Sequence, residues 1–145
     1  MMNTLITLLE EETALLQSLV GAAMRQQQAL IRLRVPELED ANAEQEKILG
    51  QIRLTERQRM RTLSSELGIT DRDATTMSLS AIISKTESDE RKALIGLQEK
   101  LSGLTRQLQE INAINRVLTH RARTSVREVM SFIEDNNVQV CNVRI

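Results

Sequence analysis

Aromatic residues are almost absent from this chain of 145 residues, which has one phenylalanine, Phe132, and neither tryptophan nor tyrosine. β-Sheets depend on β-branched and aromatic side chains that fit a pleated, half-buried surface, so all-β folds are excluded. Glycine and proline are also scarce, at five residues and one residue. The apolar residues are mostly leucine, isoleucine, alanine and methionine, a mixture that favours long or bundled helices. We therefore predict an all-α fold.

The chain also lacks an excess of one charge, a second cysteine and a long apolar run. Its 19 basic and 20 acidic side chains nearly cancel, so no net positive field attracts nucleic acid or anionic lipid. Cys141 is the only cysteine, which excludes an intrachain disulfide and favours a reducing compartment. The longest stretch without a polar side chain, residues 19–24, is too short to span a membrane, and residues 1–9 lack the basic side chain of a signal peptide. We expect a soluble, cytoplasmic protein with no nucleic-acid partner and no membrane insertion.

Groupings typical of catalysis or cofactor binding are missing too. The only histidine, His120, has no second histidine with which to build a di-iron site, and Val117 stands three residues before it. Cys141 has no partner thiol at the spacing of zinc ligands. The five glycines are scattered and form no phosphate-binding loop. We expect no catalytic residues, no metal site, no cofactor and no enzymatic activity.

Two breaks divide the chain, which we interpret as one helical domain over residues 1–137 followed by a C-terminal tail, 138–145. Pro36 disfavours helical geometry at the residue before it but suits the first turn of a new helix, and Gly68 can adopt the left-handed conformation that closes a helix. The apolar spacing predicts three long helices, at about residues 4–34, 36–67 and 88–134, and one short helix in the linker, at about residues 76–84. The tail alternates apolar and polar side chains, as an extended segment would.

The last predicted helix has the most regular apolar pattern in the chain. From Leu94 to Phe132 the inward positions recur at alternating steps of three and four residues, a heptad seam typical of coiled coils. Asn115 interrupts the leucines and isoleucines of this seam, and a buried amide at such a position sets the register of the packing. The residues expected to form the seam and set its register are Leu108, Ile111, Asn112, Asn115 and Leu118.

Helix lengths predict that the end of this last helix projects beyond the rest of the bundle. At about 1.5 Å per residue, the first two helices are about 45 Å long and the last about 70 Å. In an up-and-down arrangement the last helix passes the turn at Pro36 near Thr119 and then overhangs by roughly 20 Å. An apolar stripe that its own chain does not cover is typical of an interaction surface. The expected partner-binding residues are Val126, Val129, Met130, Phe132 and Ile133.

Four short patterns follow one another along the chain. They are Leu5-x-x-Leu8-Leu9-x-x-Glu12, Glu46-Lys47-x-Leu49-x-x-Ile52, Leu67-Gly68-Ile69, and Leu108-x-x-x-Asn112-x-x-Asn115-x-x-Leu118. In this order and spacing they resemble the FlgN family of flagellar export chaperones, over nearly the whole chain. The resemblance implies a cytoplasmic, non-enzymatic chaperone that holds the C-terminal helical segments of hook–filament junction proteins, FlgK and FlgL, and delivers them to the type III export apparatus. It also implies that cargo binds the C-terminal part of the chain.

A second interpretation of the same apolar stripe stays open. A structural coiled-coil adaptor would use the exposed seam for self-association and form a homodimer through the C-terminal helix. The overhang is common to both interpretations. The sequence therefore does not choose between an export chaperone that binds a partner helix and an adaptor that binds a second copy.

Overall fold

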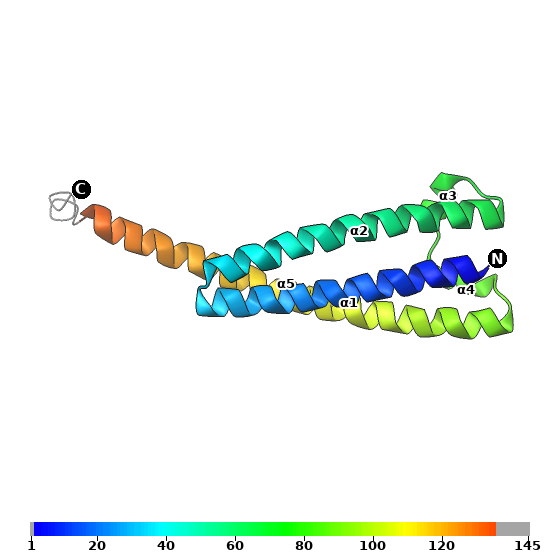
Figure 1. Ribbon diagram of the computed structural model, residues 1–145, viewed down its shortest axis with the longest axis horizontal. Coiled ribbons are helices and arrows are strands. Elements are labelled where there is room, and N and C mark those ends of the chain that lie inside the picture. Colours follow the sequence, from blue (N-terminus) through cyan, green and yellow to red (C-terminus); the bar gives the residue numbers. More distant parts are fainter. Residues whose placement is uncertain (1, 136–145) are drawn as a thin grey trace.

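The structure is a computed structural model that describes residues 2–135, apart from the side chain of residue 88 (Figure 1). Its five helices are α1 (Met2–Arg32), α2 (Val35–Leu67), α3 (Asp71–Thr76), α4 (Leu79–Ser84) and α5 (Ser88–Asp135). No strand occurs within the described range, and the all-α prediction is confirmed. The extended tail expected at residues 138–145, which includes Cys141, lies outside the described residues.

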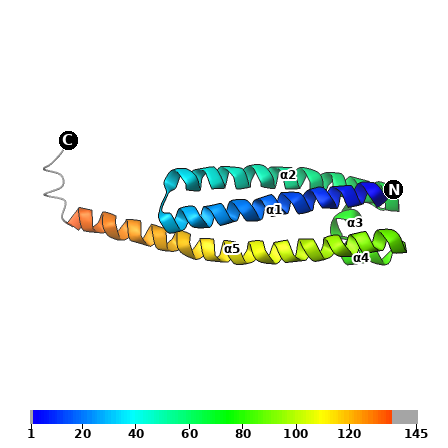
Figure 2. The ribbon, with the colours of Figure 1, turned by 60° about the horizontal axis from the view of Figure 1, so that its bottom comes forward.

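α1 is the helix on which the other two long helices pack. It contacts both α2 and α5, whereas no Cα atom of α2 comes within 8 Å of one of α5 in the part of the chain that the structure describes. Figure 2 shows α1 lying between the other two long helices. The small side chains of Ala22 and Ala23 are completely buried and allow neighbouring helices to approach α1 closely.

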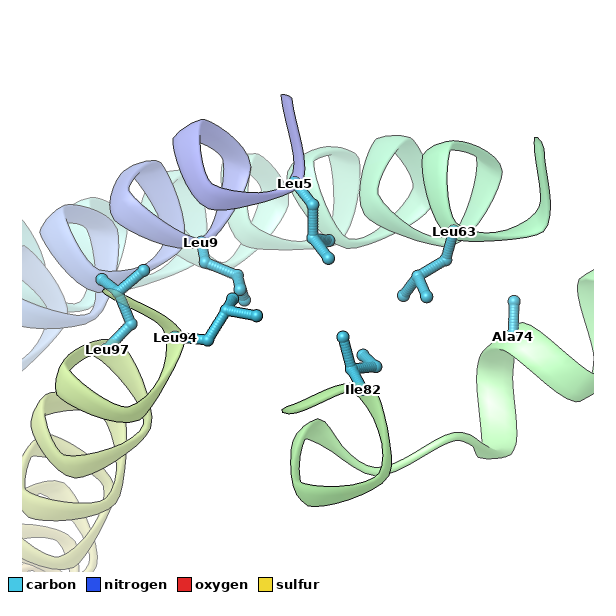
Figure 3. Close-up of a cluster of buried hydrophobic side chains, with 7 residues drawn as sticks. All are labelled: Leu5, Leu9, Leu63, Ala74, Ile82, Leu94 and Leu97. Carbon is cyan, nitrogen blue, oxygen red and sulfur yellow. The ribbon is translucent and has the colours of Figure 1, made fainter. Parts of the chain in front are cut away.

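A cluster of buried apolar side chains joins all five helices near the N-terminus of α1 (Figure 3). Its members are Leu5, Leu9, Leu63, Ala74, Ile82, Leu94 and Leu97. α3 packs on α2 and α4 packs on α5, so Ala74 and Ile82 enter the cluster from the linker. The two short helices therefore connect α2 with α5 at this end, where α2 and α5 do not contact each other directly.

A smaller cluster joins the three long helices nearer the middle of the molecule. Leu19 and Ala22 of α1 pack with Ile48 of α2, and the half-buried Leu108 of α5 packs against them. The seam positions from residue 101 to residue 111 are half-buried rather than fully buried, because α1 is the one long helix whose backbone contacts α5 in the described range. One edge of the predicted seam is thus open to solvent.

The linker differs from its prediction, since it contains two short helices instead of one. Each has its own N-terminal cap: the hydroxyl of Thr70 accepts a hydrogen bond from the backbone N–H of Asp73 at 3.2 Å, and the hydroxyl of Ser78 accepts one from Ala81 at 3.1 Å. A side-chain cap satisfies one of the free N–H groups at a helix start. Two capped starts therefore divide the segment into two helices of 6 residues each.

α5 is the longest helix, with 48 residues, and its C-terminal part extends past the connection between α1 and α2 (Figure 1 and Figure 2). The side chains from Arg123 to Asp135 are exposed, except for the half-buried Ile133. The projection that helix lengths predict is therefore present, and we call residues 123–135 the overhang. Among the described residues, no helix is both long enough and apolar enough to cross a lipid bilayer.

We predict that Leu63→Ala lowers the free energy of unfolding by about 3 kcal/mol, since it removes buried methyl groups from the main cluster and leaves a cavity. Leu54→Ala is the matched control: it makes the same change on the same helix, at a side chain that is 58% exposed against 2% for Leu63. Urea denaturation of both variants measures the difference. Equal losses of stability would show that the main cluster does not hold α2 in place.

Candidate functional site

The overhang presents the side chains that the sequence predicts for partner binding. Val126, Val129, Met130 and Phe132 are between 51% and 68% exposed, and Ile133 is half-buried. Val126, Val129 and Met130 line one hollow, while Phe132 and Ile133 do not line it. The structure thus brings three of the five predicted residues together at one place.

This hollow, which we call the outer hollow, has a volume of about 560 Å³ and lies between α5 and the connection from α1 to α2. Its lining comes from the end of α1 and the residue that follows (Leu30, Ile31, Leu33) and from α5 (Leu118, Arg121, Ala122, Ser125, Val126, Val129, Met130). Nearly all of these side chains are apolar, and Arg121 is the one charged member. Such an apolar groove with few polar groups is typical of a site that accepts an apolar helix face.

A second hollow, which we call the inner hollow, lies on the side of α5 that faces α2. It also has a volume of about 560 Å³ and is lined by Gln26, Leu30, Leu38, Asn42, Thr119, Ala122, Arg123, Val126 and Arg127. Leu30, Ala122 and Val126 line both hollows and separate one from the other. The start of the overhang therefore has a recess on each side, apolar in the outer hollow and of mixed polarity in the inner hollow, and arginines are the charged side chains in both linings.

The α1–α2 corner that forms one wall of the outer hollow has an unusual backbone. Leu33 has a φ of 53°, and the N–H of Arg34 donates to the carbonyl of Ala29 at 2.9 Å, which is the helix-ending Schellman motif. Gly68 ends α2 in the same way, with a φ of 64° and a bond from Ile69 to Ser64. A side chain in this conformation costs about 1 kcal/mol or more, which glycine avoids. Leu33 bears this cost although its side chain is 72% exposed.

A layer of amide side chains crosses the bundle just before the overhang. Asn115 of α5 is buried, and its Nδ2 donates to the carbonyl oxygen of Ala23 at 2.9 Å and to Oε1 of Gln26 at 3.0 Å. Gln26 in turn donates to Oδ1 of Asn42 at 2.8 Å and accepts from Gln45 at 3.0 Å. The layer therefore connects all three long helices. Oδ1 of Asn115 is buried and has no hydrogen-bond partner within the described residues.

The other predicted seam residues lie around this layer. Leu108, Ile111, Asn112 and Leu118 are half-buried, and Leu118 also lines the outer hollow. A buried amide that bonds to only one set of partners favours one alignment of its helices. That Asn115 sets the register of α5 stays a prediction.

An ion pair lies between α1 and α2 at some distance from the overhang. Nε of Arg59 donates to Oε1 of Glu12 at 2.8 Å, and both side chains are largely buried. Burial of the carboxyl raises the pKa of Glu12 above its ordinary value of 4.5. The hydrogen bond and the positive charge of Arg59 offset part of this effect, and the nearby Glu56 adds to it. This pair lines a third, more polar hollow between α2 and α5.

Residues that could serve as metal ligands are not grouped in the described part of the chain. No group of three or more histidine, cysteine, aspartate or glutamate side chains converges there to hold a metal ion. His120 is exposed on α5, and Cys141 lies outside the described range. The overhang instead combines two recesses, an exposed apolar helical stripe and a rim of arginines.

Comparison with known proteins identifies the family. The family described as FlgN protein matches residues 1–142 of the chain. The chain belongs to the FlgN family. A relative described as the uncharacterised protein YvyG of Bacillus subtilis is 31% identical over 118 residues, which cover 81% of this chain and 62% of that protein's length. No solved structure matches the chain.

The FlgN match extends over the helical bundle and the overhang together, so the projecting part of α5 belongs to the family region.

Several residues of this surface were missed in the sequence. Leu33 fits the three- and four-residue spacing of the apolar positions before it, so the sequence predicts it on the buried side of a helix, and Ile31 is not part of that spacing. The sequence did contain one signal. A tight corner between helices favours glycine or asparagine, and residues 33–36 contain neither, so another side chain has to occupy the left-handed position. Gln26 gave no signal, because it lies among other glutamines.

We predict that Asn115→Leu raises the free energy of unfolding by about 1 kcal/mol, because it removes a buried oxygen without a partner. Both acceptors that lose Asn115 keep another donor: the Ala23 carbonyl has its helix hydrogen bond, and Gln26 has Gln45. Asn115→Asp is the contrasting variant, and we expect it to destabilise the fold because it buries a charge and loses the donor. Urea denaturation compares them. A strong loss of stability in Asn115→Leu would mean that the amide layer stabilises the bundle.

We predict that Glu12 makes the fold less stable as the pH rises. Because the folded-state pKa is raised, the folded state holds the proton more tightly than the unfolded state. The wild type should therefore lose stability relative to Glu12→Gln as the pH increases from below 4.5 through the raised pKa.

Arg59→Gln tests the assigned cause of this pH dependence. Removing the guanidinium eliminates the interaction that lowers the pKa of Glu12, so the loss of stability should extend to higher pH. Urea denaturation at a series of pH values measures both effects. Parallel pH profiles for the wild type and Glu12→Gln would show that burial does not perturb this carboxyl.

Proposed function

We propose that this FlgN chain is a cytoplasmic export chaperone for flagellar hook–filament junction proteins of the FlgK and FlgL type. In this role it holds the C-terminal helical segments of the cargo and delivers them to the type III export apparatus. The observation that supports the proposal most is the exposed apolar stripe of the overhang, where Val126, Val129 and Met130 line a recess large enough for apolar side chains of a partner helix.

The physical basis of holding such cargo is the burial of apolar surface. A helical segment outside its final assembly exposes the apolar face that later packs in the filament, and this face promotes aggregation. An amphipathic helix that lies along the overhang buries that face and the stripe of α5 together. Met130 suits this role because its flexible side chain adapts to different partner surfaces.

A second candidate, self-association of the overhang, is favoured by one observation. Val129 and Phe132 continue the heptad seam that begins at Leu94, and such spacing is what paired identical helices use. In this case the chain would be a structural adaptor that forms a homodimer through α5. A cargo-binding experiment separates the two candidates.

We predict that Val129→Ala combined with Phe132→Ala weakens binding of the C-terminal segment of a FlgK-type junction protein by roughly tenfold to a hundredfold. Both side chains lie outside the buried clusters, at 58% and 68% exposure, so the melting temperature should stay close to that of the wild type. Isothermal titration calorimetry measures the affinity, and analytical ultracentrifugation of the chain alone measures self-association.

The matched control is Ile114→Ala combined with Val117→Ala. These side chains lie on the same helix at 50% and 52% exposure, and they lie outside the linings of the outer and inner hollows. We expect the control to bind like the wild type. A double variant at Val129 and Phe132 that loses only self-association would support the adaptor, and one that melts much earlier would mean that these side chains belong to the core.

A further inference from the structure

We propose that the α1–α2 corner, through Ile31 and Leu33, forms the second wall of the cargo site. We propose further that the arginines around it select an amphipathic helix with acidic residues beside its apolar stripe. The inference rests on the chaperone function proposed above. It adds to that function a second binding surface and the chemical class of the partner helix.

The backbone of Leu33 provides the first argument. Two helix ends in this chain share the same left-handed geometry, and the other one uses Gly68, which has no side chain to strain. Leu33 keeps a large apolar side chain there although it is 72% exposed and belongs to neither buried cluster. A partner that buries this side chain explains why a leucine occupies a position that favours glycine.

The position of the corner provides the second argument. Ile31 and Leu33 line the outer hollow opposite Val126 and Val129, so the recess has an apolar wall from each of two elements. An isolated helical stripe contacts a partner helix on one side only. A recess with two walls encloses the partner's apolar face, as in helix-in-groove recognition.

The charges around the hollows provide the third argument. The charged side chains that line the outer and inner hollows are Arg121, Arg123 and Arg127. With Arg116, they are the only arginine, lysine, aspartate or glutamate side chains between residues 111 and 127, a stretch that Glu110 and Glu128 flank. None of these four arginines forms an ion pair within residues 2–135.

This basic rim identifies the partner by its chemistry. A helix with aspartate or glutamate beside its apolar stripe would place these carboxylates near the arginines, which favours its capture and its orientation. A second copy packed in parallel would bring its own arginines to the same recess, as the homodimer interpretation through the heptad seam requires. Charge complementarity therefore favours an acidic partner helix over parallel self-pairing at this place.

The first test removes the side chain of Leu33 and keeps the backbone geometry. Leu33→Gly and Leu33→Asn both suit a positive φ, so the melting temperature should stay the same or rise. Fluorescence anisotropy with the labelled C-terminal segment of a FlgK-type junction protein should show binding weakened by roughly tenfold. Leu54→Asn is the control, because it removes an exposed leucine from α2, away from both hollows.

The second test reverses the charge of the rim. Arg121→Glu combined with Arg123→Glu should weaken the same binding by roughly tenfold at low salt, and this difference should shrink as salt is added. Arg57→Glu combined with Arg61→Glu makes the same change in net charge on exposed side chains of α2 and should have little effect. Two designed amphipathic peptides with one apolar stripe, flanked by glutamate or by lysine, complete the test, and the glutamate peptide should bind more tightly.

The outcomes distinguish this inference from the proposed function. The Leu33 variants or the charge-reversed variant could bind the junction segment as tightly as the wild type. Either result would overturn the inference and leave the chaperone function standing. Binding of the glutamate peptide that depends on Leu33, without binding of any junction segment, would support the inference and overturn the proposed cargo. Leu33 variants that change only the oligomeric state would overturn it in favour of a homodimer interface. Absence of both kinds of binding would overturn both proposals.

Discussion

The packing of α1 against both other long helices is the contact on which the rest of the structure depends. α2 and α5 do not approach each other within the described residues, so the apolar faces of both are covered mainly by α1. Fully buried alanines at positions 22 and 23 make this double contact possible. Because α2 and α5 pack against the same helix and not against each other, the space between them is filled at one end by α3 and α4 and stays partly open elsewhere.

The amide layer adds directional hydrogen bonds to helix contacts that are otherwise apolar. Leucine contacts tolerate small shifts along a helix axis, whereas the bonds from Asn115 to Ala23 and Gln26 require one alignment. The layer lies immediately before the point where α5 leaves the bundle. If Asn115 sets the register as predicted, we expect its alignment to determine both the length of the overhang and the facing of Val126 toward the corner.

Periodicity and helix breakers predicted most of the fold, since they depend on local chemistry. The spacing from Leu94 onward, the proline at position 36 and the glycine at position 68 placed the three long helices and the overhang. The linker was harder, because Thr70 and Ser78 are ordinary polar residues until their hydroxyls cap a helix. Pro36 predicted the corner, but the exposure of Leu33 there was missed for a related reason: Leu33 continues an apolar period, and only the three-dimensional path of the chain shows that it turns outward. Partners of Asn115 and of Glu12 come from distant segments, which no single-sequence pattern specifies.

The continuity of α5 has a consequence for the entropy of binding. A helix as short as residues 123–135 is marginal in water when it stands alone, because starting a helix is costly while extending one is not. Here the bundle supplies the start, since α5 is already fixed by Leu94 and Leu97 and runs without interruption into the overhang. A partner therefore meets a surface whose backbone is ordered in advance. Less of the free energy of association is then spent on ordering this chain than a segment that folds on binding would require.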